Sequence, residues 1–458
     1  MGQAKLTREK PLPRKTKLIY GAGDLGFSLT DTTIGVLFAI YLTDVVGLAP
    51  ALAAFAIFAG RSWDYINDPL MGYLTDRTST RWGRRRPFLL FGFIPFAVAF
   101  TMLWWIPPIN NSYGLAAYYA IAYLFYDAAA TFVYMPYYAL TPELTPDYDE
   151  RTSLTSYRMA FSIIGGLMAF TIPLAIIGTM RPENAEKVLM VGVGFGVVSA
   201  LPLLLTFFGT RERAEYFSQA QPKIKESLRA ATRNQPFLFA AGIFLFTWTA
   251  LEIVQAMLLF FLKYRMGLEE QSDIVAGTVF IAALLTLPFW VWISNRWDKR
   301  KAYITGMIFL SGVIITLIVI DPSWGLAVVL VLAALAGVGV GAVHVLPWSM
   351  IPDAVEVDEL ATGQRHEGMF YSLVTLFRKV ASSIALPLVL VTLDRSGYVS
   401  NAAFQAPSAV RAIQTMTGLV PAVFLLIGVA FASLYPLSRE KHIEAREELA
   451  RRRALSSQ

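Results

Sequence analysis

The sequence contains no cysteine among its 458 residues. Disulfide bonds, thiolate metal sites and a cysteine nucleophile are therefore excluded. Only 16% of the residues are charged, whereas a soluble globular protein carries about a quarter. The three histidines, His344, His366 and His442, are scattered along the chain, and no metal-ligand spacing is present. These absences argue against an enzyme that needs a nucleophile with an adjacent base or a metal cluster.

Apolar residues make up 55% of the chain. Many apolar runs are longer than about 18 residues, the length at which a helix can cross a bilayer. So many long runs cannot all be buried in one water-soluble core, and helices are the spanning structure that uninterrupted runs support. Short alternating segments, which are typical of barrel strands, do not dominate. The chain is therefore predicted to be an all-α integral membrane protein.

The length criterion predicts twelve spans. They cover roughly residues 18–43, 49–74, 87–107, 113–141, 154–178, 187–208, 236–262, 273–294, 301–320, 324–352, 367–393 and 409–434. We therefore expect a six-helix bundle in 1–208, a cytoplasmic linker in 209–235 and a second six-helix bundle in 236–458. Two such bundles around a midplane cavity are typical of a secondary transporter that works by alternating access.

The net charge of +6 comes from basic residues that cluster in the terminal tails, the linker and the loops 75–86 and 295–301. Basic loops on one side predict a protein of the cell membrane with both termini on the cytoplasmic side. This placement does not indicate a nucleic-acid partner. Four basic residues are exceptions on the opposite side: Arg181, Lys263, Arg265 and Arg395. The basic N-terminus has no small-residue cleavage site and is expected to be a retained tail.

Three charged residues, Arg61, Asp64 and Asp68, lie in the second expected span. Charges inside a membrane are costly and usually functional. On a helix Asp64 and Asp68 share one face, with Asn67 beside them. An oxygen-rich site suits a hard cation such as Na⁺, or a proton. The alternative is a structural ion pair with Arg61 or Lys379, and Lys379 could instead extend its amine to the membrane edge.

Further polar residues inside the spans are candidates to contact a solute. In the first span, residues at spacings of four and three line one face. Aromatic rings near carboxylates suit sugar rings, although rows of aromatic residues in membranes also serve packing. The candidates are Asp24, Ser28, Asp31, Asp127, Tyr134, Glu252 and Trp348.

Charged residues also surround the connections between spans four and five and between spans ten and eleven. They form either solvated loops or ion pairs that close the cytoplasmic mouth and break when the bundles rock. The candidates for such a gate are Glu143, Arg151, Arg158, Asp353, Glu356, Arg365 and Glu367.

Four segments together resemble the glycoside–pentoside–hexuronide:cation symporters, a branch of the major facilitator superfamily. They are YLTDVVGL, DYINDPLMGYLTDRTSTRWGRRRPF, MPYYALTPELTPDYDERTSLTSYR and PDAVEVDELATGQRHEGMFYS. The resemblance implies twelve helices in two bundles, and a cation site formed by Asp64, Asn67 and Asp68 on helix two with Thr131 on helix four. It implies coupling to Na⁺, with H⁺ or Li⁺ as substitutes. The family's helix-two arginine and helix-eleven lysine correspond to Arg61 and Lys379.

The family's sugar-binding acids on helices one and four correspond to Ser28 and Tyr134 in this chain. Asp31 and Asp127 could substitute for them from the same helix faces. The resemblance implies a functional monomer that carries a glycoside, pentoside or related carbohydrate together with a cation and uses no cofactor. The alternative is a carrier of the same fold for an amphipathic or anionic solute, such as a lysolipid or a uronate.

Overall fold

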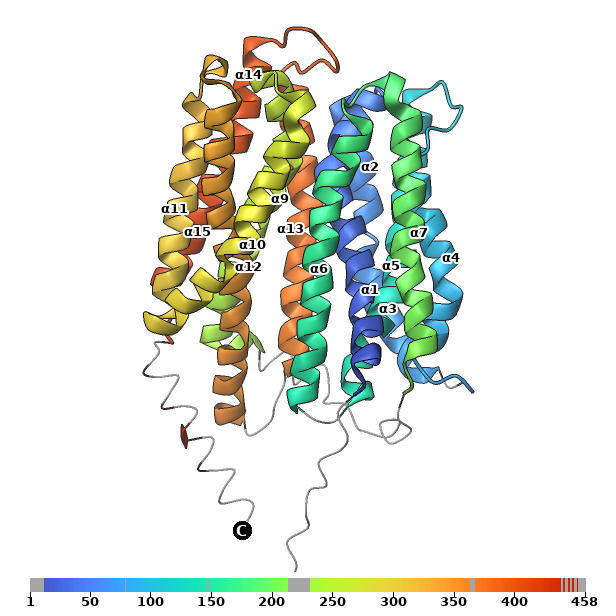
Figure 1. The fold of residues 1–458 in the computed structure, drawn as a ribbon, viewed down its shortest axis with the longest axis vertical. Coiled ribbons are helices and arrows are strands. Elements are labelled where there is room, and N and C mark those ends of the chain that lie inside the picture. The colour runs from blue at the N-terminus through green and yellow to red at the C-terminus, as the bar shows by residue number, and fades with distance from the viewer. Residues whose placement is uncertain are drawn as a thin grey trace, which may run out of the picture. The chain divides into compact units, whose positions relative to one another are not determined.

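The structure is a computed structural model that describes residues 12–78, 80–145, 148–212, 231–362 and 367–437, and a few residues between 440 and 451. Most described residues lie in helices (Figure 1). The described ranges contain no β-strand, only an isolated bridge between Thr80 and Gly83.

The helical elements before the linker follow one another with short connections. They are α1 (Arg14–Thr33), the π-helical turns η1 (Ile34–Phe38) and η2 (Tyr41–Val45), α2 (Pro50–Arg61), α3 (Asp64–Arg77), α4 (Arg86–Leu103), α5 (Ser112–Leu144), α6 (Tyr148–Ile177), η3 (Pro182–Asn184) and α7 (Ala185–Gly209).

The helical elements after the linker continue the same pattern. They are α9 (Gln235–Phe260), η5 (Phe261–Met266), η6 (Glu269–Gln271), α10 (Ser272–Arg296), α11 (Lys299–Val319), η7 (Pro322–Trp324), α12 (Gly325–Thr362), α13 (Glu367–Arg395), α14 (Pro407–Gln414), η8 (Thr415–Leu419) and α15 (Val420–Ser433).

Each of the twelve expected spans coincides with one helix or with consecutive helical segments, so the predicted all-α plan is confirmed. Several details differ from the expectation. The fifth span begins at Tyr148, six residues early. The third span ends at Leu103, four residues early. The tenth continues to Thr362, ten residues beyond its expected end. The second is interrupted by a turn at residues 62–63, between α2 and α3.

Several helices begin where the sequence places a capping side chain. Asn111, Asn234 and Asp298 precede α5, α9 and α11, and each side chain accepts a hydrogen bond from a backbone N–H of the first turn, at 3.0, 2.9 and 2.7 Å. These bonds satisfy donors that a helix start would otherwise leave unpaired. The helix starts are therefore encoded locally, as well as by the apolar runs.

The contacts within the chain define two compact units. The first unit comprises Met1–Ile34, Ala59–Ile177 and Glu183–Gln219. The second comprises Gly35–Phe58, Gly178–Pro182 and Ala220–Gln458. The second unit thus contains two short segments that precede the linker in sequence.

Close packing in the first unit depends on small residues. A Cβ atom on Gly165 of α6 would lie 2.4 Å from the carbonyl oxygen of Leu25 on α1, and one on Gly26 of α1 would lie 2.4 Å from the carbonyl oxygen of Ser199 on α7. These distances are too short for any larger residue. α1 is therefore held in backbone contact with both α6 and α7.

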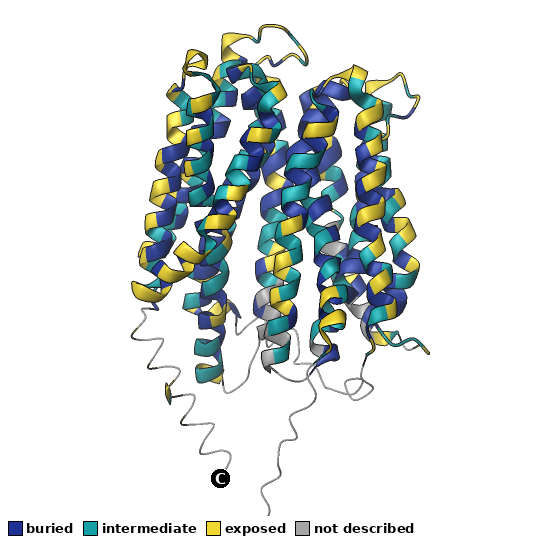
Figure 2. Ribbon diagram, viewed as in Figure 1, coloured by how far each residue is buried: buried dark blue, intermediate teal, exposed yellow. Residues whose placement is uncertain are grey.

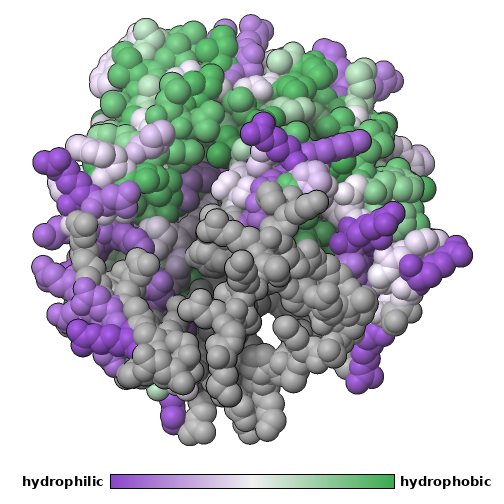
Figure 3. Space-filling model, turned by 60° about the horizontal axis from the view of Figure 1, so that its bottom comes forward, coloured by the Kyte–Doolittle hydropathy of each residue, from purple (hydrophilic) through white to green (hydrophobic). Residues whose placement is uncertain are grey.

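The helices expose apolar residues on their outer faces, as membrane spans must. Figure 2 shows exposed residues along the helices with buried residues on other faces, and the exposed ones include Phe55, Phe91, Ile94, Leu285 and Val319. In Figure 3 hydrophilic residues gather toward the end facing the viewer, and hydrophobic surfaces lie behind them.

Nine segments of the described chain are long and apolar enough to cross a membrane. The segments that fall short contain α1, α2 with α3, and α5. These helices carry most of the candidate cation and solute residues of the first unit. α2 is apolar but too short to cross a membrane by itself, because it ends at Arg61, before the turn at 62–63.

A carboxylate from the end of α7 caps α4 in the first unit. Glu212 accepts hydrogen bonds from the backbone N–H groups of Arg84, Arg85 and Arg86 at 2.5, 2.8 and 2.8 Å. Gly83 adopts a positive φ of 109°, and a Cβ there would lie 2.6 Å from this carboxylate. A negative charge at the N-terminus of a helix is stabilised by the orphan N–H groups and by the helix dipole.

We expect Glu212→Ala to lower the stability of the protein by about 1–2 kcal/mol, because three backbone donors lose their acceptor. The change is measured as the thermal unfolding midpoint of the purified protein. Glu270→Ala, which removes an exposed carboxylate, is the matched control and should leave the midpoint unchanged. Equal midpoints for the two variants would show that the cap adds nothing.

Candidate functional site

Two of the expected cation residues, Asp68 and Thr131, meet where α3 packs against α5 in the first unit. Thr131 Oγ1 of α5 donates a hydrogen bond to Asp68 Oδ1 of α3 at 3.3 Å. Asn67 is 5% exposed, and its Nδ2 is a buried atom with no hydrogen-bond partner among the described residues. Asp64 begins α3 one helical turn before Asp68, but its side chain lies outside the described part of the structure.

These oxygen atoms are of the kind that bind hard monovalent cations. Asp68 offers a carboxylate, Thr131 a hydroxyl and Asn67 an amide. The oxygen and nitrogen of an amide are assigned from hydrogen bonding, so the partnerless buried end of Asn67 can equally present an oxygen. No three acidic or histidine side chains in the described ranges meet to hold a metal ion.

Arg61, expected beside the acids of the second span, lies 4.0 Å from Asp31 Oδ1 on α1. Its guanidinium also lies over the ring of Tyr123 on α5, 5.7 Å from the centroid. The turn at 62–63 separates Arg61 from the α-helix that carries Asp64 and Asp68. Arg61 therefore ends α2, whereas Asp64 and Asp68 both belong to α3.

Asp24 and Arg158 were expected in different sites, the first for solute and the second for the gate. The structure brings them together: Arg158 Nε donates to Asp24 Oδ2 at 2.7 Å, and Asp24 is only 3% exposed. The guanidinium lies 4.6 Å from the ring centroid of Tyr138, a cation–π contact.

Tyr20 stacks on Tyr137 with centroids 4.8 Å apart, and each hydroxyl donates to the other's backbone carbonyl.

Tyr134 is buried among aromatic rings of the first unit. Its ring meets Phe27 and Phe96 edge-on, with centroids 5.0 and 5.4 Å apart. Its hydroxyl has no hydrogen-bond partner among the described residues. Ser28, one residue after Phe27, and Asp127, two turns before Tyr134, are half-buried. A buried hydroxyl without a partner is costly unless a ligand or water satisfies it.

The candidates of the second unit lie on α9, α12 and α13. Glu252 is 7% exposed and accepts a hydrogen bond from Ser382 at 2.6 Å. Trp348 packs edge-on against Phe244, with centroids 4.8 Å apart. Lys379 is half-buried on α13. Arg378, its neighbour, lies 4.7 Å from the ring centroid of Trp248, a contact that the sequence did not predict.

Three gate candidates, Glu143, Arg158 and Asp353, have ion-pair partners within their own units. In the first unit Glu143 accepts from Arg84 at 2.5 Å and from Arg85 at 3.2 Å. In the second, Lys299 contacts Asp353 at 2.7 Å, and Asp353 and Glu356 lie on the last turns of α12 rather than in a loop. Arg365 and the side chains of Arg151 and Glu367 lie outside the described part of the structure. The gate therefore remains a prediction.

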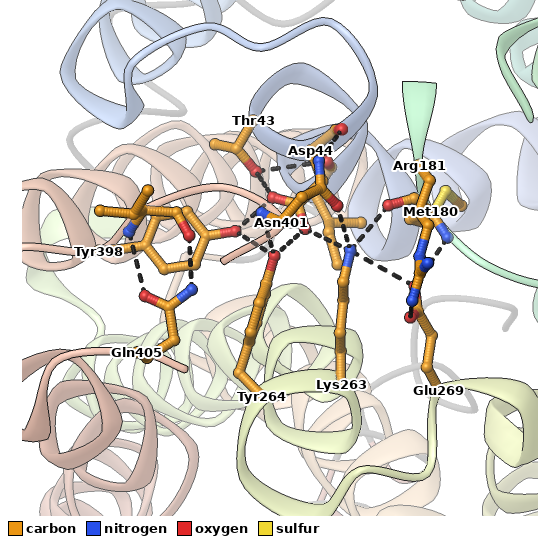
Figure 4. A network of polar contacts seen from close by, with 12 residues as sticks. Thr43, Asp44, Met180, Arg181, Lys263, Tyr264, Glu269, Tyr398, Asn401 and Gln405 are labelled. Carbon is orange, nitrogen blue, oxygen red and sulfur yellow. Dashed lines mark hydrogen bonds and ion pairs between the residues drawn. The ribbon is translucent and has the colours of Figure 1, made fainter. Parts of the chain in front are cut away.

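One buried network in the second unit was not predicted (Figure 4). Asp44 is fully buried and accepts hydrogen bonds from Lys263 Nζ at 2.7 Å, from Thr43 Oγ1 at 2.9 Å, and from the hydroxyls of Tyr264 and Tyr398. Two signals were available in the sequence. Asp44 is an acid at the end of an apolar run, and Lys263 is an exception to the distribution of basic loops.

Membrane-length helices in two units, with ionisable pairs buried inside them, define a secondary transporter of the major facilitator class. A family model described as MFS/sugar transport protein matches residues 19–439. An uncharacterized symporter of Synechocystis is 34% identical over 95% of this chain and 96% of its own. A sodium-dependent lysophosphatidylcholine symporter of Danio rerio is 28% identical over 95% of this chain and 88% of its own.

The inward-open structure of the xylose transporter XylE from E. coli shares the fold. Its TM-score is 0.66 at 14% identity, over 94% of this chain and 98% of its own. The chain therefore belongs to the MFS/sugar transport protein family. It is a multi-pass membrane symporter and not an enzyme, as the sequence predicted.

Proposed function

We propose that the protein is a Na⁺-coupled symporter whose cation site is formed by Asp64, Asn67 and Asp68 of α3 and Thr131 of α5. The contact between Thr131 and Asp68 carries this proposal, because it joins α3 and α5 through oxygen atoms within two of the expected spans. The sodium dependence named for the Danio rerio relative supports Na⁺ as the cation. H⁺ and Li⁺ are the substitutes to test.

The coupling follows from charge. Asp64 and Asp68 lie one turn apart on the same helix, so their carboxylates repel each other when the site is empty. A bound cation removes this repulsion and favours solute binding nearby, and by reciprocity the solute favours the cation. We assign Lys379 the role of a charge partner that responds to the occupancy of the site.

The basic loops support a cell-membrane location with both termini in the cytoplasm.

We infer that the solute is amphipathic and carries a charged headgroup, as a lysophospholipid does. The sequence has Ser28 and Tyr134 where the resembling symporters have sugar-binding acids. Asp24 lies 2.7 Å from Arg158, and Asp31 lies 4.0 Å from Arg61, so an arginine already partners each of these carboxylates. The name of the Danio rerio relative supports the same class of solute.

A small carbohydrate is the second candidate, and Tyr134 favours it. The buried hydroxyl of this residue has no hydrogen-bond partner among the described residues, and it lies in an aromatic cluster. A sugar would satisfy the hydroxyl and stack its C–H face on a ring. The description of the family model, sugar transport, supports this candidate as well.

Thermal stabilisation of the purified protein in sodium chloride and in choline chloride separates the candidates. We expect lysophosphatidylcholine to raise the unfolding midpoint by a few degrees more in Na⁺ than in choline, because cation and solute stabilise each other's binding. A monoacylglycerol shares the chain but lacks the charged headgroup, and it controls for detergent-like effects. A Na⁺-dependent shift with a disaccharide instead would establish the second candidate. Identical midpoints in Na⁺ and choline for every solute would contradict Na⁺ coupling.

A further inference from the structure

The network around Asp44 joins four separate segments of the second unit. Asp44 belongs to η2, Lys263 and Tyr264 to η5, and Tyr398 and Asn401 to the connection between α13 and α14. Lys263 Nζ also donates to the carbonyl oxygen of Met180 at 2.8 Å and to Asn401 Oδ1 at 2.9 Å. Asn401 Nδ2 donates to the carbonyl oxygen of Asp44 at 2.6 Å (Figure 4).

Two of these segments precede the linker in sequence. Gly35–Phe58, which contains Asp44, and Gly178–Pro182, which contains Met180, are part of the second unit, whereas their neighbours in sequence belong to the first. The Asp44 network is therefore where segments from the first half of the chain attach to helices from the second half. Motion of one half of the chain against the other must act on these attachments.

The backbone is irregular where the chain passes between the units. Ile34 is the last residue of the segment Met1–Ile34 of the first unit, and it starts the π-helical turn η1. Gly178, where the chain enters the second unit again, has a φ of 73°. After Phe58 the chain returns to the first unit, and the turn at 62–63 follows. π-helical turns and glycines with positive φ are places where a backbone changes direction and where functional bends are common.

The network also accounts for basic residues that depart from the expected topology. Lys263 and Arg181 lie on the side opposite the basic loops, yet Lys263 contacts Asp44 at 2.7 Å and Glu269 at 3.4 Å. Arg181 lies 3.9 Å from Glu269. Acids of the same unit thus balance the positive charge of Lys263 and Arg181. These contacts explain why the two basic residues occur away from the basic loops.

We propose that Asp44 is the centre of a clasp that closes the transporter on the side opposite its basic loops and opens once in each transport cycle. The clasp consists of Asp44, Lys263, Tyr264, Tyr398 and Asn401, and it holds the segments 35–58 and 178–182 in the second unit. Opening it separates Asp44 from donors contributed by the second half of the chain and admits solute from that side.

The chemistry of the clasp suits repeated opening. Each contact is a hydrogen bond or an ion pair, so water can take the place of every donor and acceptor when the segments separate. An apolar seal would instead expose hydrophobic surface. Burial, together with the nearby charge of Asp44, raises the pKa of Tyr398 far above its usual range, so its hydroxyl remains a donor. Both carboxylate oxygens of Asp44 are occupied in the closed state.

Because the chain contains no cysteine, a single introduced cysteine reports which side is open. Gln255→Cys places the thiol on α9, two turns before Lys263 and beside Gly35. The experiment measures labelling of this thiol by a membrane-impermeant maleimide, added separately to each face of sealed vesicles. In the Gln255→Cys background, we expect Asp44→Asn to raise the labelling rate from the face opposite the N-terminus by about tenfold or more.

Tyr398→Phe removes a single donor and should give a smaller increase in the same direction. Asp321→Asn, which removes an exposed carboxylate from the connection between α11 and α12, should leave the rate unchanged. A variant that is merely misfolded reacts equally from both faces, so the ratio of the two rates separates an opened clasp from a loss of structure. Ratios for Asp44→Asn and Tyr398→Phe equal to that of the parent would overturn the proposal. This readout needs neither solute nor Na⁺ and is therefore independent of the proposed cation site.

Discussion

Asp68→Asn is expected to abolish Na⁺-driven accumulation of solute. The substitution keeps the shape of the side chain and a possible hydrogen bond with Thr131, but removes the negative charge that holds the cation. Losing a direct ligand should weaken Na⁺ binding by about a hundredfold or more, since even indirect partners of a bound metal contribute about 10–100-fold. Uptake into proteoliposomes with an imposed Na⁺ gradient measures the effect.

The same variant should still exchange solute when no gradient is present. The neutral amide that replaces the carboxylate lacks the repulsion that the cation relieves in the native protein, so solute binding no longer depends on Na⁺. Retained exchange also shows that the protein is folded. Uphill accumulation by purified Asp68→Asn at the native rate would refute the assignment.

Thr131 offers a matched pair of variants for this experiment. Thr131→Ser keeps the hydroxyl 3.3 Å from Asp68 Oδ1, whereas Thr131→Val keeps the branched shape and loses the hydroxyl. Only the valine variant should raise the Na⁺ concentration needed for half-maximal uptake. This comparison separates a cation ligand from a residue that packs two helices together.

The fold could be predicted because membranes impose strong rules on composition. Each span must be about 20 apolar residues long and must satisfy its backbone internally, so the helices could be located from hydropathy alone. The turn at residues 62–63 was not predicted, because the length criterion treats 49–74 as one span and the polar residues around the turn, Arg61, Ser62 and Asp64, do not by themselves end a helix. The continuation of α12 to Thr362 was missed for the opposite reason: the helix leaves the apolar run and continues with charged residues.

Spacing alone could predict only relations that are local in sequence, whereas the family resemblance supplied the distant pair of Thr131 and Asp68. The shared face of Asp64 and Asp68 follows from a spacing of four on one helix. The partners of Asp24 and Asp31 could not be derived from spacing, because Arg158 lies 134 residues from Asp24 and Arg61 belongs to another helix. A buried charge predicts that a partner exists, but only packing decides which residue fills that role.

The Asp44 network was also missed because its residues are distant in sequence. Lys263 and Arg181 are exceptions to the expected distribution of basic residues. Lys263 has one acidic partner nearby in sequence, Glu269, but its buried partner Asp44 is 219 residues away. Such exceptions are therefore useful signals in a membrane sequence. A basic residue on the less basic side, together with an acid at the end of another span, indicates a pair to look for.

The pair Asp24–Arg158 should give the second large effect. Arg158→Gln leaves the buried carboxylate of Asp24 without its partner and is expected to destabilise the protein by about 3–5 kcal/mol. The double variant Asp24→Asn/Arg158→Gln removes both charges, and most of the lost stability should return. Thermal unfolding of the purified single and double variants, compared in a double-mutant cycle, measures this coupling.

Transport should not return with stability. Arg158 contacts Tyr138 and Asp24 inside the first unit, and a guanidinium is the side chain best suited to bind an anionic headgroup such as a phosphate. We therefore expect the double variant to be stable yet to take up the charged amphipathic solute at least about tenfold more slowly than the native protein. Recovery of both stability and uptake would instead show that the pair only holds α1 against α6. If the solute is a sugar, we expect the double variant to recover uptake together with stability, because a neutral ring does not require the guanidinium charge.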